Sequence, residues 1–229
     1  MSDTKLYSYL MTHDSGFAPN PFHGHLTLAT CMTDIRRTKK VGQWVAGFAS
    51  KALVKKCKAI GISIPYQGLI YLMEIGEIMT LDCYFRDPRF QQKKAIPLGS
   101  NNLLQERGDN IYYANSDGQY TQLENDNHDI GEFDKDTRGR NVLIAKQFYY
   151  FGRNCIVPKE SWTSMNINVP DRYIAYGSES DGDAVGKLVD YLRLHTERDG
   201  ALGLPCIWDA VQGQKKMPAP DKFATHQIY

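Results

Sequence analysis

The stretch GLIYLMEIGEIMTLDCYF, residues 68–85, decides the fold class of this chain. It is apolar and rich in β-forming residues, which predicts a strand that continues into a second strand or a short helix. Shorter runs of alternating, β-forming residues occupy 5–12, 43–49 and 141–150. We therefore expect residues 5–12, 43–49, 68–75 and 141–150 to lie in one small, curved, mainly antiparallel sheet or barrel.

Helical patterns are scarce by comparison. Residues 181–200 give the clearest one, with apolar side chains at helical spacing behind an aspartate that can cap the helix start. Because regular helices do not separate the strands, a doubly wound parallel sheet is disfavoured and an α+β fold with flanking helices is predicted.

The chain is expected to form a single domain over residues 1–229. Residues 97–140 are rich in Gly, Asn and Asp, which indicates a long, loop-rich excursion inserted into the fold. Residues 213–229 have little core-forming pattern and are predicted to be an irregular tail.

Composition indicates a cytoplasmic protein. The chain has 229 residues, 42% of them hydrophobic, and a formal net charge of +1, so it is not globally basic. No apolar run is long enough to span a membrane, and no signal-peptide pattern opens the sequence. The five cysteines are widely spaced without a CxxC, which is typical of free thiols in a reducing compartment.

The neutral total conceals a basic segment at residues 31–60. This segment holds eight Lys or Arg residues and a single acidic residue, Asp34. Such a concentration can mark a surface that faces phosphates, and it can equally be a solvated face that keeps the protein in solution.

Several short segments together resemble a known family. The order of KVGQWVAGFAS (40–50) and LIYLMEIGEIMTLDCYFRDPRF (69–90) is similar to PUA-like domains of the EVE and ASCH type. More specifically, FAPNPFHGHLTLATC (17–31), IRR (35–37), GDNIYY (108–113) and FYYFG (148–152) resemble the nucleotide modification associated domain 2 family. The resemblance implies a PUA-like barrel and a bacterial or phage protein linked to nucleic-acid base modification, and it names a pathway rather than a reaction.

Two histidines are candidate acid–base residues. His23 and His25 stand two apart on a predicted strand, so both side chains would project from one face. They could bind a metal, exchange protons or hydrogen-bond a ligand, or one of them could be structural. A metal site needs a third ligand, and none stands at a recognisable spacing, so we predict neither metal nor cofactor. Asp109 is the candidate carboxylate that would assist them.

Basic and aromatic side chains are candidates for holding a nucleotide. Arg36 and Arg37 are adjacent, so one could bind a phosphate while the other pairs with Asp34. Trp44 and Tyr149 offer flat faces for stacking a base, although a core position would explain either ring as well.

Three further candidates could read the edge of a base. Asn20 stands in a proline-rich turn, and Asn110 and Tyr113 follow the flexible Gly108. Turn formation is the simpler role for Asn20, and an edge strand for the other two.

Two functions remain open from the sequence. The first is a binding module that accepts a modified base of a nucleic acid or nucleotide in an aromatic and histidine-lined pocket. The second is an enzyme acting on a nucleotide or modified base by histidine acid–base catalysis. The sequence has no GxSxG, HExxH, GxGxxG or GxxxxGK[ST] motif, which favours binding.

Overall fold

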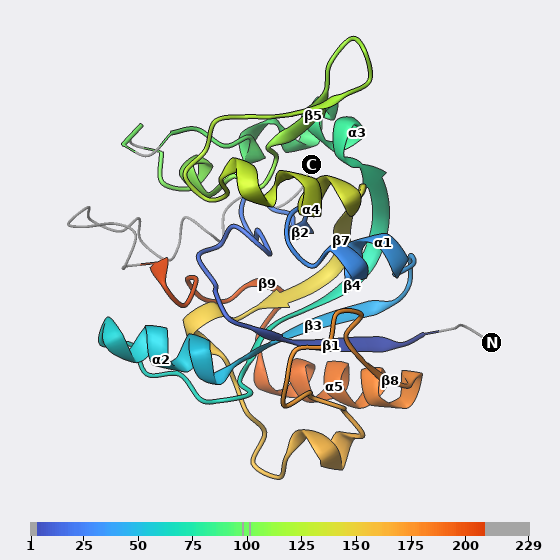
Figure 1. Cartoon of the computed structure of the whole chain (residues 1–229). Helices are drawn as coiled ribbons and strands as arrows, with labels where there is room; N and C mark the ends of the chain where they lie inside the picture. The colour runs from blue at the N-terminus through green and yellow to red at the C-terminus, as the bar shows by residue number, and fades with distance from the viewer. Residues whose placement is uncertain (1–3, 98, 101, 209–229) are drawn as a thin grey trace.

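A seven-stranded mixed sheet forms the centre of the molecule (Figure 1). The computed structural model describes residues 4–97, 99–100 and 102–208. The sheet runs in the order β2-β7-β4-β3-β1-β8, and β9 also pairs with β7. Its strands are β1 (Leu6–Met11), β2 (Thr27–Leu28), β3 (Trp44–Ala49), β4 (Leu69–Thr80), β7 (Asn141–Tyr150), β8 (Ser178–Ser180) and β9 (Gly200–Ala201).

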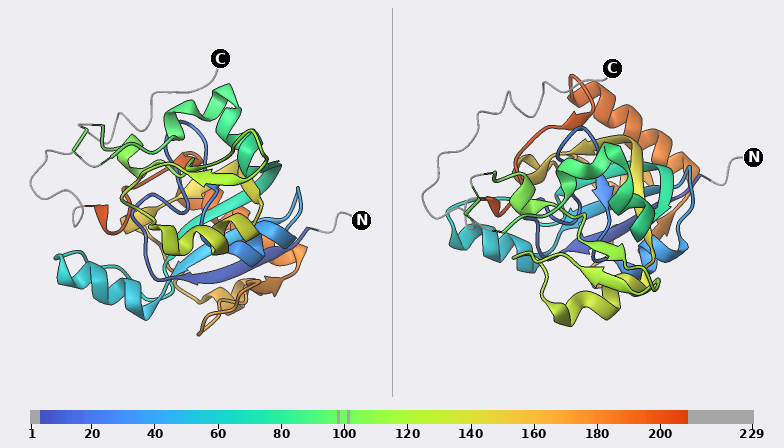
Figure 2. Two further views of the ribbon diagram at one scale, coloured as in Figure 1. Left: turned by 45° about the horizontal axis from the view of Figure 1, so that its top comes forward. Right: turned by 90° about the horizontal axis from the view of Figure 1, so that it is seen from above.

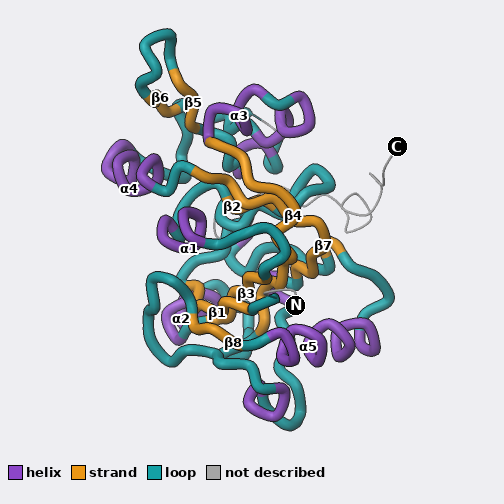
Figure 3. The backbone as a smooth tube through the Cα atoms, turned by 90° about the vertical axis from the view of Figure 1, so that its right-hand side faces the viewer, coloured by secondary structure: helices purple, strands orange, loops and turns teal. Residues whose placement is uncertain are grey.

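The longest pairing joins β4 and β7, as the opening stretch of the sequence predicts. Their antiparallel register runs from Tyr71 opposite Tyr150 to Thr80 opposite Asn141. The register shifts twice around Ile75, and a Cβ atom at Gly76 would stand 2.6 Å from Cβ of Lys146, so this irregularity requires glycine. Figure 3 shows both strands extending beyond the rest of the sheet.

All four segments predicted to form one sheet do so. The α+β class is confirmed, and antiparallel pairs predominate, although β1 pairs with β3 and β7 with β9 in parallel. Among the described residues the sheet stays open, because its end strands β2 and β8 do not pair and no closed barrel forms. The strand predicted to carry His23 and His25 begins only at Thr27, as β2, since the chain before it forms turns.

Helices and core clusters cover both faces of the sheet. On one face α5 (Gly182–His195) buries Val185, Leu188, Val189 and Leu192 against Trp44, Ala46 and Phe48 of β3. The side chain of Asp181 accepts a hydrogen bond from the Ala184 amide and caps the helix, which confirms the predicted start. On the other face Val45 and Ala49 pack with side chains of α1 (Thr33–Thr38) and α2 (Lys51–Ala59).

The described part of segment 97–140 lies over one end of the sheet (Figure 2). It contains η2 (Gln105–Arg107), the hairpin of β5 (Tyr112–Ala114) and β6 (Tyr120–Gln122), η3 (Ile130–Glu132) and α4 (Phe133–Arg138). The remaining elements are α3 (Leu81–Arg86), η1 (Pro88–Lys93), η4 (Gly152–Asn154) and η5 (Trp162–Met165). The predicted tail at 213–229 lies outside the described residues.

The packing of α5 gives a direct test of the core. Leu188 is fully buried beneath the sheet, whereas Leu194 on the same helix is 83% exposed. We expect Leu188→Ala to lower the free energy of unfolding by about 2–5 kcal/mol, because it removes buried methyl groups and leaves a cavity. Leu194→Ala should change it by less than about 0.5 kcal/mol in the same urea titration. Equal effects of the two substitutions would contradict the placement of α5.

Candidate functional site

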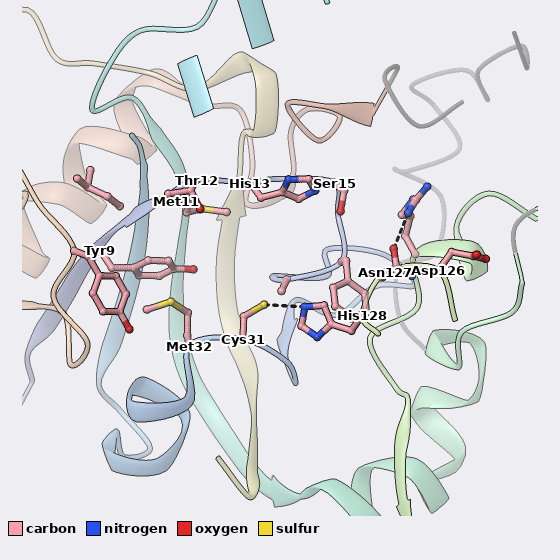
Figure 4. Close-up of a pocket in the computed structure, with 15 residues that line it drawn as sticks. Tyr9, Met11, Thr12, His13, Ser15, Cys31, Met32, Asp126, Asn127 and His128 are labelled. Carbon is pink, nitrogen blue, oxygen red and sulfur yellow. Dashed lines mark hydrogen bonds between the residues drawn. The ribbon is translucent and has the colours of Figure 1, made fainter. Parts of the chain in front are cut away.

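A pocket of about 550 Å³ opens beside the carboxyl end of β1 (Figure 4). Its walls come from β1 and the following loop, from the turn before α1 and from the loop before η3. Seven of the fifteen lining side chains are apolar or aromatic: Tyr9, Leu10, Met11, Phe17, Ala18, Met32 and Tyr173. The polar lining side chains are Thr12, His13, Ser15, Cys31, Arg107, Asp126, Asn127 and His128.

A thiol, an imidazole and a carboxylate form a chain at one wall of this pocket. The Sγ atom of Cys31 lies 3.4 Å from Nε2 of His128, and Nδ1 of His128 lies 2.8 Å from Oδ2 of Asp136. Figure 4 shows the thiol and the imidazole facing each other across the pocket wall. The order is that of a nucleophile, a base and a group that orients the base.

The backbone around Cys31 is held in an uncommon conformation. Cys31 and Met32 have φ angles of 55° and 36°, a left-handed region that residues other than glycine rarely adopt. The Cys31 amide donates to Oδ1 of Asp136 over 2.7 Å, and Nε of Arg36 donates to the Cys31 carbonyl over 2.7 Å. Strain fixed by surrounding contacts in this way is typical of functional positions.

Asp136 contacts both Cys31 and His128. Besides His128 and the Cys31 amide, its fully buried carboxylate accepts a hydrogen bond from the Tyr112 hydroxyl over 3.1 Å. Arg36 lies 3.4 Å from the same carboxylate and donates to the carbonyls of Asp136 and Asn141. Removing the Asp136 carboxylate would leave the buried Arg36 guanidinium without a counter-ion, so the pair fixes α4 against α1.

The imidazole of His128 is oriented on several sides. Its ring packs edge-on against Phe17, and Oδ1 of Asn125 accepts a hydrogen bond from its amide. Burial lowers the pKa of His128, but the hydrogen bonds to Asp136 and Cys31 outweigh it and raise this pKa to about 10. The imidazole is therefore protonated at neutral pH, and its Nε2 faces the sulfur of Cys31.

Part of segment 17–31, which contains the two predicted histidines, does line the pocket, through Phe17, Ala18 and Cys31. His23 and His25 precede β2 in a turn, and neither is a lining residue. His23 has a φ of 58°, and His25 packs edge-on against Phe90. Burial, followed by Lys93 and Arg89, lowers the pKa of His25. The two histidines are therefore not on a strand.

The two predicted arginines lie in different surroundings. Arg36 is fully buried, and its guanidinium contacts Asp136 and three backbone carbonyls rather than solvent. Arg37 is exposed and pairs with Asp34 at 3.1 Å. Neither arginine lines the pocket.

A buried polar network holds three other predicted residues. Asn20 donates to the Arg107 carbonyl and accepts from the ammonium of Lys93. Asp109 accepts hydrogen bonds from Thr27 and Tyr84, and Asn110 donates to backbone carbonyls of Tyr84 and Phe90. The network connects η1, η2 and β2, and it meets the pocket at Arg107.

The aromatic candidates are packed within the protein. Trp44 and Tyr149 are buried in the cluster beneath α5. Tyr113 stacks on Phe85 with a ring separation of 4.6 Å. The roles predicted for these residues in binding a base stay predictions.

Three observations concern metal binding, membrane-spanning helices and the cysteines. No group of three or more His, Cys, Asp or Glu side chains in the described residues could hold a metal ion. Within the same part of the chain, no helix combines the length and apolar character needed to cross a membrane. All five cysteines are free thiols.

Reasoning from the sequence missed Cys31, His128 and Asp136 as one unit. The sequence signal that could have indicated this unit is a cysteine and a histidine far apart in the chain. Catalytic partners of this kind come together only in the folded protein.

The comparisons with known proteins agree with the family resemblance. The family model described as nucleotide modification associated domain 2 matches residues 3–209. No curated protein and no solved structure matches the chain. The matched range covers all of the described residues, the pocket and its cysteine included. The chain therefore belongs to the nucleotide modification associated domain 2 family.

Proposed function

We propose that this protein is a thiol-dependent enzyme that acts on a nucleotide or on a group attached to a nucleic-acid base. The observation that carries the proposal is the alignment of Cys31, His128 and Asp136 at the wall of a pocket. The family supplies the link to nucleotide modification.

The reaction class that fits this arrangement best is acyl transfer. The Cys31 thiolate attacks the carbonyl carbon of an amide or ester, a carbon–sulfur bond forms, and the carbonyl π electrons move to oxygen. When this intermediate collapses, the amine or alcohol departs with a proton from His128. Water or a second amine, deprotonated by His128, then attacks the thioester and frees the thiol.

Asp136 acts through His128 in this scheme. Its carboxylate keeps Nδ1 of the ring engaged, so that Nε2 faces the sulfur. The same carboxylate accepts a hydrogen bond from the Cys31 amide, which fixes the sulfur relative to the imidazole.

The pocket supports a substrate that contains a flat ring. Its volume of about 550 Å³ lies within the usual range for small-molecule sites, and Tyr9, Phe17 and Tyr173 supply aromatic walls. An aromatic-lined pocket for a base is thus retained from the sequence analysis, with other aromatic residues in place of Trp44 and Tyr149.

An enzyme is favoured over a binding module because a reader of bases has no use for an activated thiol. Of the side chains proposed for a binding module, Arg36, Trp44 and Tyr149 are buried within the protein. The accessible chemistry of the pocket is that of Cys31 and His128.

Alkylation of Cys31 tests the proposal. Cys83 is the exposed thiol elsewhere in the chain, so Cys83→Ser provides the background. At pH 6.5 an ordinary thiol is about 1% ionised, yet we expect iodoacetamide to modify Cys31 rapidly at this pH. His128→Asn should slow the modification at least about tenfold, as followed by intact-protein mass spectrometry.

The matched control is His195→Asn, which alters an exposed histidine on α5 far along the chain from the pocket. It should leave the rate of alkylation unchanged. If Cys31 reacts at pH 6.5 no faster than a free thiol, or if both histidine variants react like the parent protein, the proposed enzyme is wrong.

The His128–Asp136 pair also predicts how stability depends on pH. The pKa of His128 is raised to about 10 in the folded state, above the ordinary value near 6.5 of the unfolded chain. The folded protein therefore binds more protons between these values, and this stabilisation is complete below pH 6.5 and lost as pH rises toward 10. Urea titrations at pH 6, 8 and 10 should show a steeper decline for the parent protein than for His128→Gln. Parallel curves would contradict the pairing.

A further inference from the structure

Arg107 is a buried cation whose hydrogen-bonding capacity is mostly unused. The side chain is 6% exposed and lines the pocket that contains Cys31. Among the described residues its guanidinium makes one side-chain hydrogen bond, from Nη1 to Oδ1 of Asn127 over 2.6 Å. A guanidinium carries five N–H donors. None of the Arg107 nitrogens is a buried atom without a partner, so its remaining donors are accessible from the pocket that the side chain lines. This side chain is therefore built to meet another acceptor.

Other cations surround the same end of the pocket. His13 lines it, and Nζ of Lys56 lies 3.5 Å from Nδ1 of His13. Partial burial, followed by the positive charges of Lys56, Arg107 and His128, lowers the pKa of His13 to about 4. Asp126 is the carboxylate that lines the pocket. Burial lowers the pKa of Arg107, whereas the negative charge of Asp126 raises it.

The backbone positions Arg107 at the edge of the site. Arg107 ends η2, and its carbonyl accepts a hydrogen bond from the buried side chain of Asn20. Asn127, the partner of its guanidinium, immediately precedes His128 in the chain. The anion-binding end and the thiol end of the pocket are thus connected through one loop.

We propose that Arg107 binds the phosphate of a nucleotide whose base or base-linked group reaches Cys31. This assignment rests on the proposed function for the identity of the reacting end. The planar guanidinium presents two parallel N–H groups to phosphate oxygens, and Lys56 adds positive charge beside His13. The substrate class is therefore a nucleoside phosphate rather than a free base or nucleoside.

Calorimetry on the Cys31→Ser protein tests this without any chemistry at sulfur. The four common deoxynucleoside 5′-monophosphates are titrated alongside their four nucleosides. At least one monophosphate should bind about tenfold or more tightly than its own nucleoside, because hydrogen bonds to a charged group are the strong ones. Inorganic phosphate should compete with it, whereas acetate at equal concentration should not.

Arg107→Gln removes the charge and keeps a donor for Asn127. It should reduce the affinity for the monophosphate to that for the nucleoside, while Arg37→Ala, at an exposed position outside the pocket, should change neither. Equal affinities of nucleotide and nucleoside in the Cys31→Ser protein would overturn the proposal, as would the absence of binding by all eight compounds. The comparison of nucleotide with nucleoside needs no change at Arg107, so it tests the proposal even if Arg107→Gln does not fold.

The two proposals can fail separately. A phosphate preference in a protein whose Cys31 is unreactive leaves the phosphate site standing and removes the enzyme. A reactive Cys31 without a phosphate preference does the reverse.

Discussion

The buried carboxylate of Asp136 is the interaction on which the site depends. It contacts four groups that come from four parts of the chain: the Cys31 amide, Arg36, Tyr112 and His128. Cys31 and Asp136 are 105 residues apart, so this one group ties the loop-rich segment to the turn before α1. Its negative charge is balanced by two cations, Arg36 beneath it and the His128 imidazolium beside the pocket. A neutral side chain at this position would release the base and the nucleophile together.

This arrangement explains why the sheet could be predicted and the site could not. The strands and α5 follow from local periodicity, which a single sequence displays directly. The site is assembled from Cys31 and from residues in segment 97–140, where no periodic pattern exists. Arg36 illustrates the difference, because adjacent arginines suggest an anion site, yet the fold places one in the core and the other at the surface.

The predicted histidine pair illustrates the same limit. Its alternation suggested a strand, but β2 begins only at Thr27 and the preceding residues form turns. The stretch does form one wall of the pocket, although through Phe17 and Cys31 rather than through its histidines. The sequence therefore indicates the correct segment, whereas contacts made in the folded chain determine which of its residues line the pocket.

The electrostatics of the pocket unite the two proposals. One end holds a thiol beside an imidazolium, the other holds a buried guanidinium, and apolar and aromatic side chains also line the pocket. Such a site is suited to a ligand with an anionic group at one end and a reactive, flat group at the other. In a largely apolar environment both charged contacts are stronger than they would be in water.

The most direct measurement of the central claim is the absorbance of the thiolate near 240 nm. The difference spectrum between the parent protein and Cys31→Ser isolates the contribution of this sulfur. The account predicts a Cys31-dependent absorbance already present at pH 6.5 and abolished by His128→Asn. A difference that appears only in the alkaline range of an ordinary thiol, with or without His128, would contradict it.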